Sequence, residues 1–79
     1  MSKDELLAKA QHDIWSHWMK YLFSVCETSP DGSVTIPADR AERWKRQAFG
    51  EYADLTEKEK ESDRGIVKDF IIPVLGGEV

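Results

Sequence analysis

The sequence predicts a small all-α domain of three helices, with an extended, turn-rich connector between the first and second. Three observations lead to this fold class. Apolar residues recur at spacings of three and four, Gly and Pro clusters divide the chain, and capping patterns precede the apolar stretches. At 79 residues the chain has room for one domain. Hydrophobic residues make up 41% and include three Trp and three Phe, which favours a folded chain over a disordered one.

The first helix is predicted over residues 3–26. Ser2 and Glu5 form an S-x-x-E capping box, in which each side chain bonds a free backbone N–H at the other's position. No Gly or Pro interrupts the stretch. The apolar positions with helical spacing are Leu6, Leu7, Ala10, Ile14, Met19, Leu22 and Phe23, with Trp15, Trp18 and Val25 beside them.

Residues 27–36 are predicted to form the connector. The run from Thr28 to Ser33 contains Pro30, Asp31 and Gly32, which is a dense turn signal. The β-branched stretch Val34-Thr35-Ile36 then predicts an extended segment, because three residues are too few to form a sheet alone.

The second helix is predicted over residues 37–48. Proline suits the first turn of a helix, so Pro37 marks its start, and Gly50 is a natural stop. The apolar positions Ala41, Trp44 and Ala48 have helical spacing.

The third helix is predicted over residues 57–72. Thr56 and Glu59 form a second capping box. Gly65 weakens this helix and is expected to allow close approach of another helix or a ligand. The expected end is at Pro73 and Gly76-Gly77, followed by the short tail Glu78-Val79. The expected buried face consists of Ile66, Val67, Phe70, Ile71 and Val74.

Charge and cysteine content limit the classes of partner and the compartment. The net charge of −4 argues against nucleic acid, whose binding calls for a basic surface. The single cysteine, Cys26, excludes an intrachain disulfide and fits a reducing compartment. No signal peptide and no apolar run long enough to span a bilayer are present, so we expect a cytoplasmic protein with no membrane partner.

The chain lacks the patterns that mark an active site. His12 and His17 are five residues apart and fall on different helix faces, so no metal site is expected. No G-x-S-x-G elbow, Cys–His–Asp arrangement or phosphate-binding glycine loop is present. We therefore expect a non-enzymatic protein without a metal or cofactor.

Aromatic residues next to cations are the pattern that best fits a binding site. Trp44 lies among Arg40, Arg43 and Arg46, and Trp15 and Trp18 follow His12. Aromatic faces stack on nucleobases and Arg side chains bind phosphates. The same pattern also fits a core Trp beside a solvated face, and it fits a protein-binding surface rich in Trp and Arg.

Two stretches resemble the ryanodine receptor repeat (RyR) domain, a helical domain that also occurs as stand-alone copies in bacterial and phage proteins. His12-Asp13-Ile14-Trp15 is similar to the family's H-x-x-W. The segment from Tyr52 to Arg64 is similar to its Y-x-x-L-[ST]-E-x-x-K-x-x-D-R signature. The resemblance covers residues 8–72. Glu51 stands where the family commonly has a proline, and residues 29–46 follow no family pattern.

The resemblance implies a non-enzymatic binding module, phage- or prophage-encoded, that recognises a small nucleotide-type ligand by aromatic stacking. Trp15 matches the family's helix-one Trp and is the expected stacking residue, with His12 and Trp18 near it. Tyr52, Asp63 and Arg64 match the signature and are expected to line the same site. Since the family's receptors carry tandem copies, a homodimer is a further hypothesis. The alternative is a protein-interaction module, a small inhibitor or adaptor, that uses helix 37–48 with Arg40, Arg43, Trp44 and Arg46.

Overall fold

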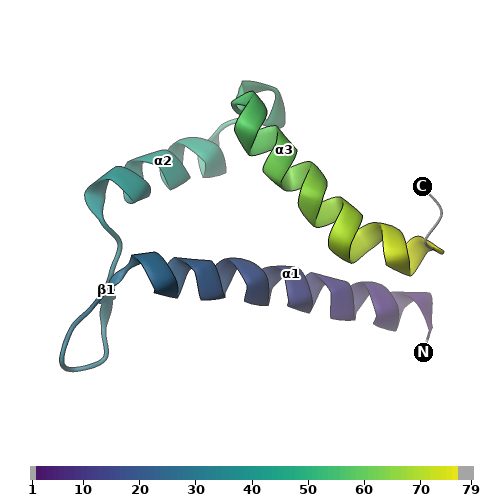
Figure 1. Cartoon of the computed structure of the whole chain (residues 1–79), viewed down its shortest axis with the longest axis horizontal. Coiled ribbons are helices and arrows are strands. Elements are labelled where there is room, and N and C mark those ends of the chain that lie inside the picture. The colour runs from purple at the N-terminus through teal and green to yellow at the C-terminus, as the bar shows by residue number, and fades with distance from the viewer. Residues whose placement is uncertain (1, 77–79) are drawn as a thin grey trace.

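The computed structural model describes residues 2–76 and confirms a small, mostly helical three-helix fold. The helices are α1 (Lys3–Val25), α2 (Ala38–Phe49) and α3 (Glu57–Ile66). They form the sides of a flat, open triangle that measures 43 × 32 × 17 Å (Figure 1). The free end of α3 returns to the N-terminal half of α1, so the two described ends of the chain lie near each other.

Helix α1 is bounded by local hydrogen bonds. The Ser2 hydroxyl accepts a hydrogen bond from the Glu5 N–H at 3.2 Å, which is one half of the expected capping box. The helix ends at Val25, where the Cys26 N–H still donates to the Leu22 carbonyl at 3.1 Å.

The connector folds back on itself as a minimal hairpin. Strand β1 (Glu27–Thr28) pairs antiparallel with β2 (Val34–Thr35). The Asp31 carboxylate accepts hydrogen bonds from the Ser33 hydroxyl at 2.6 Å and N–H at 2.9 Å, which lower the pKa of Asp31. Gly32 has a φ of 92°, which glycine adopts without strain. These local bonds close the turn, so the segment predicted as merely extended forms a two-stranded ladder.

The corner between α2 and α3 is set by glycine and by side-chain caps. At Gly50 a Cβ atom would lie 2.9 Å from the Arg46 carbonyl oxygen, so a side chain would clash where the chain leaves α2. The short 3-10 turn η1 (Tyr52–Asp54) follows. There the Asp54 carboxylate accepts the Glu51 N–H at 3.1 Å. Two residues later Thr56 and Glu59 form the complete capping box that the sequence predicts.

The helical stretch that begins with α3 does not end at residue 72 but changes from α-helical to other helical geometries. It continues as the π-helical turn η2 (Val67–Ile71) and the 3-10 turn η3 (Ile72–Leu75). Pro73 has no N–H to continue an α-helical ladder, and Gly76 ends the element with a φ of 116°. The expected tail Glu78-Val79 and Gly77 lie outside the described residues.

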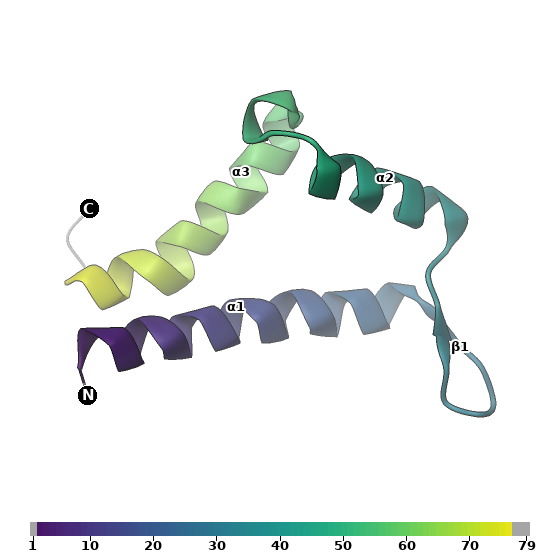
Figure 2. The same ribbon diagram turned by 180° about the vertical axis from the view of Figure 1, so that it is seen from behind.

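The packed elements bury few side chains completely. Helix α1 packs against η2 and η3 near its N-terminal half. Figure 2 shows from behind that the backbone of α1 lies apart from the corner between α2 and α3. Within residues 2–76 only Ala10 is fully buried, with 4% of its surface exposed. Among these residues no helix is both long and apolar enough to cross a membrane.

The glycine in the middle of α3 has free space around it. A Cβ atom at Gly65 would have no heavy atom within 4 Å, so the expected close approach of another helix is wrong, and the approach of a ligand stays a prediction. We expect Gly65→Ala to raise the free energy of unfolding by about 0.5–1 kcal/mol, because alanine costs less backbone entropy in a helix. Urea unfolding of the two proteins at equal concentration measures this. A destabilised variant would contradict the open surroundings of this position.

Candidate functional site

A groove of about 830 Å³ lies between the three helices. All three helices contribute side chains to it. Trp18 and Tyr21 come from α1, and Trp44 comes from α2. The other lining residues are Met19, Leu22, Arg43, Gln47, Thr56, Lys58, Glu59, Ser62 and Asp63.

A chain of five aromatic rings connects η2, α1 and α2, and three of the rings line this groove. Phe70 of η2 lies 5.9 Å from His17, and His17 lies 4.9 Å from Trp18, edge-on at 78°. Trp18 then meets Tyr21 at 6.4 Å and 83°, and Tyr21 meets Trp44 at 6.5 Å and 61°. Edge-to-face pairs at these distances are favourable. The aromatic chain therefore links η2, α1 and α2 with little help from a buried core.

Tyr21 is held in place by a cation from α2. The Arg40 guanidinium donates a hydrogen bond to the Tyr21 hydroxyl at 2.9 Å and lies 5.9 Å from the centre of its ring. Both contacts are favourable for Arg beside an aromatic ring. Arg40 thus braces one wall of the groove and is already engaged within the chain.

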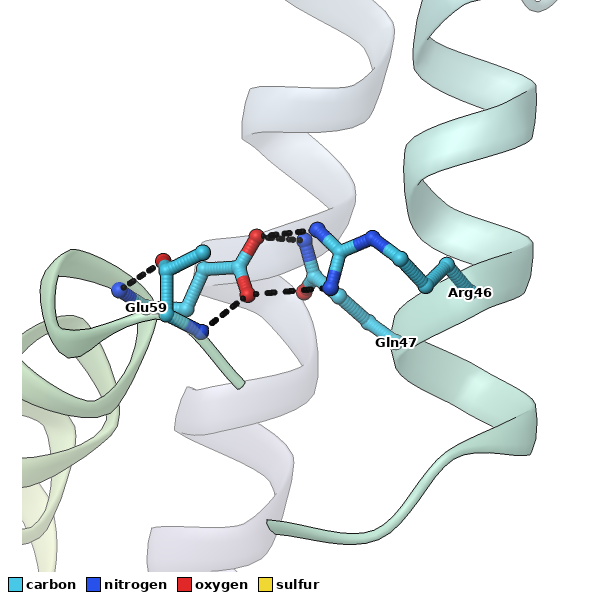
Figure 3. A network of polar contacts seen from close by, with 4 residues as sticks. Arg46, Gln47 and Glu59 are labelled. Carbon is cyan, nitrogen blue, oxygen red and sulfur yellow. Dashed lines mark hydrogen bonds and ion pairs between the residues drawn. The ribbon is translucent and has the colours of Figure 1, made fainter. Parts of the chain in front are cut away.

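Glu59 ties α3 to α2 at the rim of the groove, as Figure 3 shows. Its carboxylate accepts hydrogen bonds from Arg46 at 2.7 Å, Gln47 at 3.1 Å and the Thr56 N–H at 3.0 Å. Only 17% of its side chain is exposed. The Arg46 hydrogen bond is the main cause that lowers the pKa of Glu59 from 4.5 to about 2, and the same bond raises the pKa of Arg46. This carboxylate is therefore ionised throughout the neutral range.

Three charged groups of the groove are left for a ligand. Arg43 and Lys58 make no hydrogen bond or ion pair within residues 2–76, and the same holds for the Asp63 carboxylate. All three residues are exposed. The groove thus presents two unpaired cations and one unpaired carboxylate around three aromatic rings.

The two residues expected to lead the site form a separate pair on α1. The rings of His12 and Trp15 stack at 6.2 Å with an interplanar angle of 27°. Trp15 is 56% exposed. Neither residue is among those that line the groove, so the structure groups Trp18 with Trp44 and Arg43 instead of with Trp15.

The residues of the Tyr52-to-Arg64 segment meet in a second hollow along α3. Tyr52, Asp63 and Arg64 line a space of about 460 Å³, whose other lining residues are Val67, Lys68 and Ile72. Arg64 is occupied, because it donates hydrogen bonds to Glu57 at 2.6 Å and to Glu61 at 2.8 Å. These bonds raise the pKa of Arg64, and Arg64 lowers the pKa of Glu61. Asp63 alone belongs to both hollows.

Of the groove residues, only Trp18, Arg43, Trp44 and Asp63 were expected from the sequence. Tyr21, Lys58 and Glu59 are among those that were missed. Tyr21 follows Trp18 at a spacing of three, which places both on one side of a helix. That spacing was a usable signal. Glu59 was assigned only its capping role, and nothing in the local pattern indicates that its carboxylate also reaches Arg46 and Gln47 across the corner.

Comparison with known proteins finds no relative of this chain. No family model matches the chain, and neither curated proteins nor solved structures give a match. The resemblance to the RyR domain therefore rests on the residues quoted above.

Proposed function

We propose that the chain is a non-enzymatic binding module whose groove recognises a small nucleotide-type ligand. One observation carries the proposal: three aromatic rings, two unpaired cations and an unpaired carboxylate line a single groove of about 830 Å³. Such a volume is in the range of small-molecule sites. A nucleotide offers a flat ring, an anionic phosphate and hydroxyl donors, which correspond to these three kinds of group.

Each part of the ligand has a candidate partner in the groove. The base would stack on Trp18 or Trp44, since stacking on an aromatic side chain contributes about 1–3 kcal/mol per base. Arg43 and Lys58 would meet the phosphate, where charge-assisted hydrogen bonds are strongest. Asp63 would accept hydrogen bonds from ribose hydroxyls. Arg40 and Arg46 take no part, because Tyr21 and Glu59 already occupy them.

The resemblance to stand-alone RyR domains supports the same class of function and a phage or prophage origin. It also supports a site on α1, although the groove moves the stacking residue from Trp15 to Trp18. A cytoplasmic location belongs to the proposal and is supported by the single cysteine.

The proposal is tested by titrating the protein with ATP, GTP, NAD and cyclic dinucleotides while following tryptophan fluorescence and heat of binding. We expect Trp18→Ala to weaken the Kd of the bound nucleotide by about 5- to 150-fold, the loss of one stacking contact. Arg43→Gln should weaken binding and reduce its dependence on salt, because one phosphate contact is lost. If no nucleotide in the panel binds the wild-type protein, the ligand class is wrong.

Trp15→Ala is the matched control. It removes an exposed tryptophan from the same helix but leaves the groove intact, so the Kd should change less than twofold. Trp18→Phe keeps a ring in place and should restore most of the affinity lost in Trp18→Ala. Loss of binding in Trp15→Ala with normal binding in Trp18→Ala would move the site to the His12–Trp15 pair.

A second candidate function, protein binding through α2, is favoured by the exposure of Phe49. This ring ends α2 and is 88% exposed, the highest value among the large apolar residues described. It lies on the helix that carries Arg43 and Trp44, and aromatic residues with Arg dominate binding hot spots. A protein partner captured by wild type and Trp15→Ala, but lost with Trp44→Ala and Phe49→Ala, would favour this function over nucleotide binding.

A further inference from the structure

The described fold exposes more surface than a single compact chain of this size. Its accessible surface is 6290 Å², whereas the size relation for folded monomers gives about 4,900 Å². Its radius of gyration is 15.4 Å against about 11.6 Å for a compact domain of this length. The surplus of roughly 1,400 Å² exceeds the ~800 Å² that each partner buries in a standard protein interface.

Helix α1 carries a regular seam of six residues, whose N-terminal half is exposed. Residues with alternating spacings of four and three form it: Ala8, His12, Trp15, Met19, Leu22 and Cys26. This is the 3.5-residue repeat along which two helices pack side by side. Ala8, His12 and Trp15 are exposed, whereas Met19, Leu22 and Cys26 are half-buried. Phe23, next to Leu22, is 57% exposed.

The seam lies on the side of α1 opposite its contact with η2. At about 100° per residue its centre lies roughly 180° around α1 from His17, the residue that contacts Phe70 of η2. Figures 1 and 2 both show α1 as one outer side of the triangle, with no described element beyond it. Met19 and Leu22 line the groove as well, so the seam runs along the edge of the groove.

The spacing of the seam is symmetric about residue 17. In an antiparallel pair of α1 helices, Ala8 would face Cys26, His12 would face Leu22, and Trp15 would face Met19 of the other copy. Each contact then occurs twice, as a two-fold axis requires. A Trp ring beside a Met sulfur is a favourable contact, and Ala with Cys allows close approach at both ends.

We propose that two copies of this chain pair through an antiparallel α1–α1 seam centred on residue 17. Charge does not oppose this pairing, although each chain carries −4 overall. Over residues 8–26 the charged residues are Lys9, Asp13 and Lys20, and Lys9 already binds Asp13 at 2.7 Å. The acidic surplus therefore lies away from the interface.

Sedimentation equilibrium of the full chain without nucleotide tests the pairing. We expect a mass twice the 9.1 kDa of one chain. Trp15→Glu places two charges in the central layers and should return the mass to one chain. Phe49→Glu is the matched control at a more exposed aromatic residue outside the seam, and its mass should stay at two chains. A single-chain mass for wild type at high concentration would overturn the proposal.

Disulfide cross-linking tests the register. Ala8→Cys should give a covalent dimer on oxidation, because its thiol would face Cys26 of the other copy. An intrachain bond is excluded, since the two positions are about 27 Å apart on one helix. Lys9→Cys, which points about 100° away, should not cross-link. Cross-linking of wild type through Cys26 alone would indicate a parallel pair and overturn the antiparallel seam.

These experiments are independent of the proposed ligand. A dimer that binds no nucleotide would leave the seam standing and remove the proposed function. A monomer that binds nucleotide would support the proposed function and overturn the seam.

Discussion

Phe70→Ala is expected to lower the free energy of unfolding by about 2–3 kcal/mol, below the cost of losing a fully buried Phe because the ring is only half-buried. Phe70 is the first ring of the aromatic chain and joins η2 to α1 through His17 at 5.9 Å. The whole free energy of unfolding of a chain of this length is only about 4–12 kcal/mol. Because the described part of this chain has a single fully buried residue, the loss of one ring between helices should destabilise the whole fold.

The measurement is urea unfolding at fixed protein concentration, because pairing of copies would make stability depend on concentration. Phe49→Ala is the control, since it removes the same side chain at a position that is 88% exposed. Its free energy of unfolding should change by no more than about 0.5 kcal/mol. Equal shifts in the two variants would show that the aromatic chain does not hold η2 to α1.

Acid should open the corner between α2 and α3, because the pKa of Glu59 is about 2 in the folded chain and 4.5 when unperturbed. The folded state binds this proton more weakly than the unfolded state does. The stabilisation that the ionised Glu59 carboxylate provides is therefore complete above about pH 4.5 and is lost as the pH falls toward 2. Stability measured by urea unfolding should decline steeply across this range.

Glu59→Gln should flatten the acid decline, because the glutamine side chain has no carboxyl proton to bind. Part of the slope will remain, since Asp31 and Glu61 also have lowered pKa values in the folded chain. The matched control is Glu42→Gln, which removes an exposed carboxylate from α2 and should leave the slope unchanged. An unchanged slope in Glu59→Gln would mean that the bonds to Arg46 and Gln47 do not stabilise the fold.

The elements were predictable where short-range chemistry decides them. Pro37, Gly50 and the Thr56–Glu59 box place the ends of α2 and the start of α3 within about a residue, because caps and stops act over one helical turn. The ladder between Glu27–Thr28 and Val34–Thr35 was not predicted, since so short a pairing depends on the side-chain bonds that close its turn.

What the sequence could not predict depends on contacts between distant segments. The π-helical winding at Val67–Ile71 occurs where η2 packs against α1, and no spacing in residues 57–72 signals it. The groove also differs from the expected site. Trp18 and Trp44 meet through Tyr21 only because α2 folds back over the C-terminal half of α1, and the length and direction of the connector decide that.

The corner at residues 50–59 has a consequence for the order of folding. Its bonds from Glu51 to Asp54 and between Thr56 and Glu59 span three residues each, so closing them costs little loop entropy. Contacts this local form within about a microsecond, whereas the Phe70–His17 contact must bring together segments more than fifty residues apart. The bend between α2 and α3 should therefore exist in the chain before the groove that it shapes.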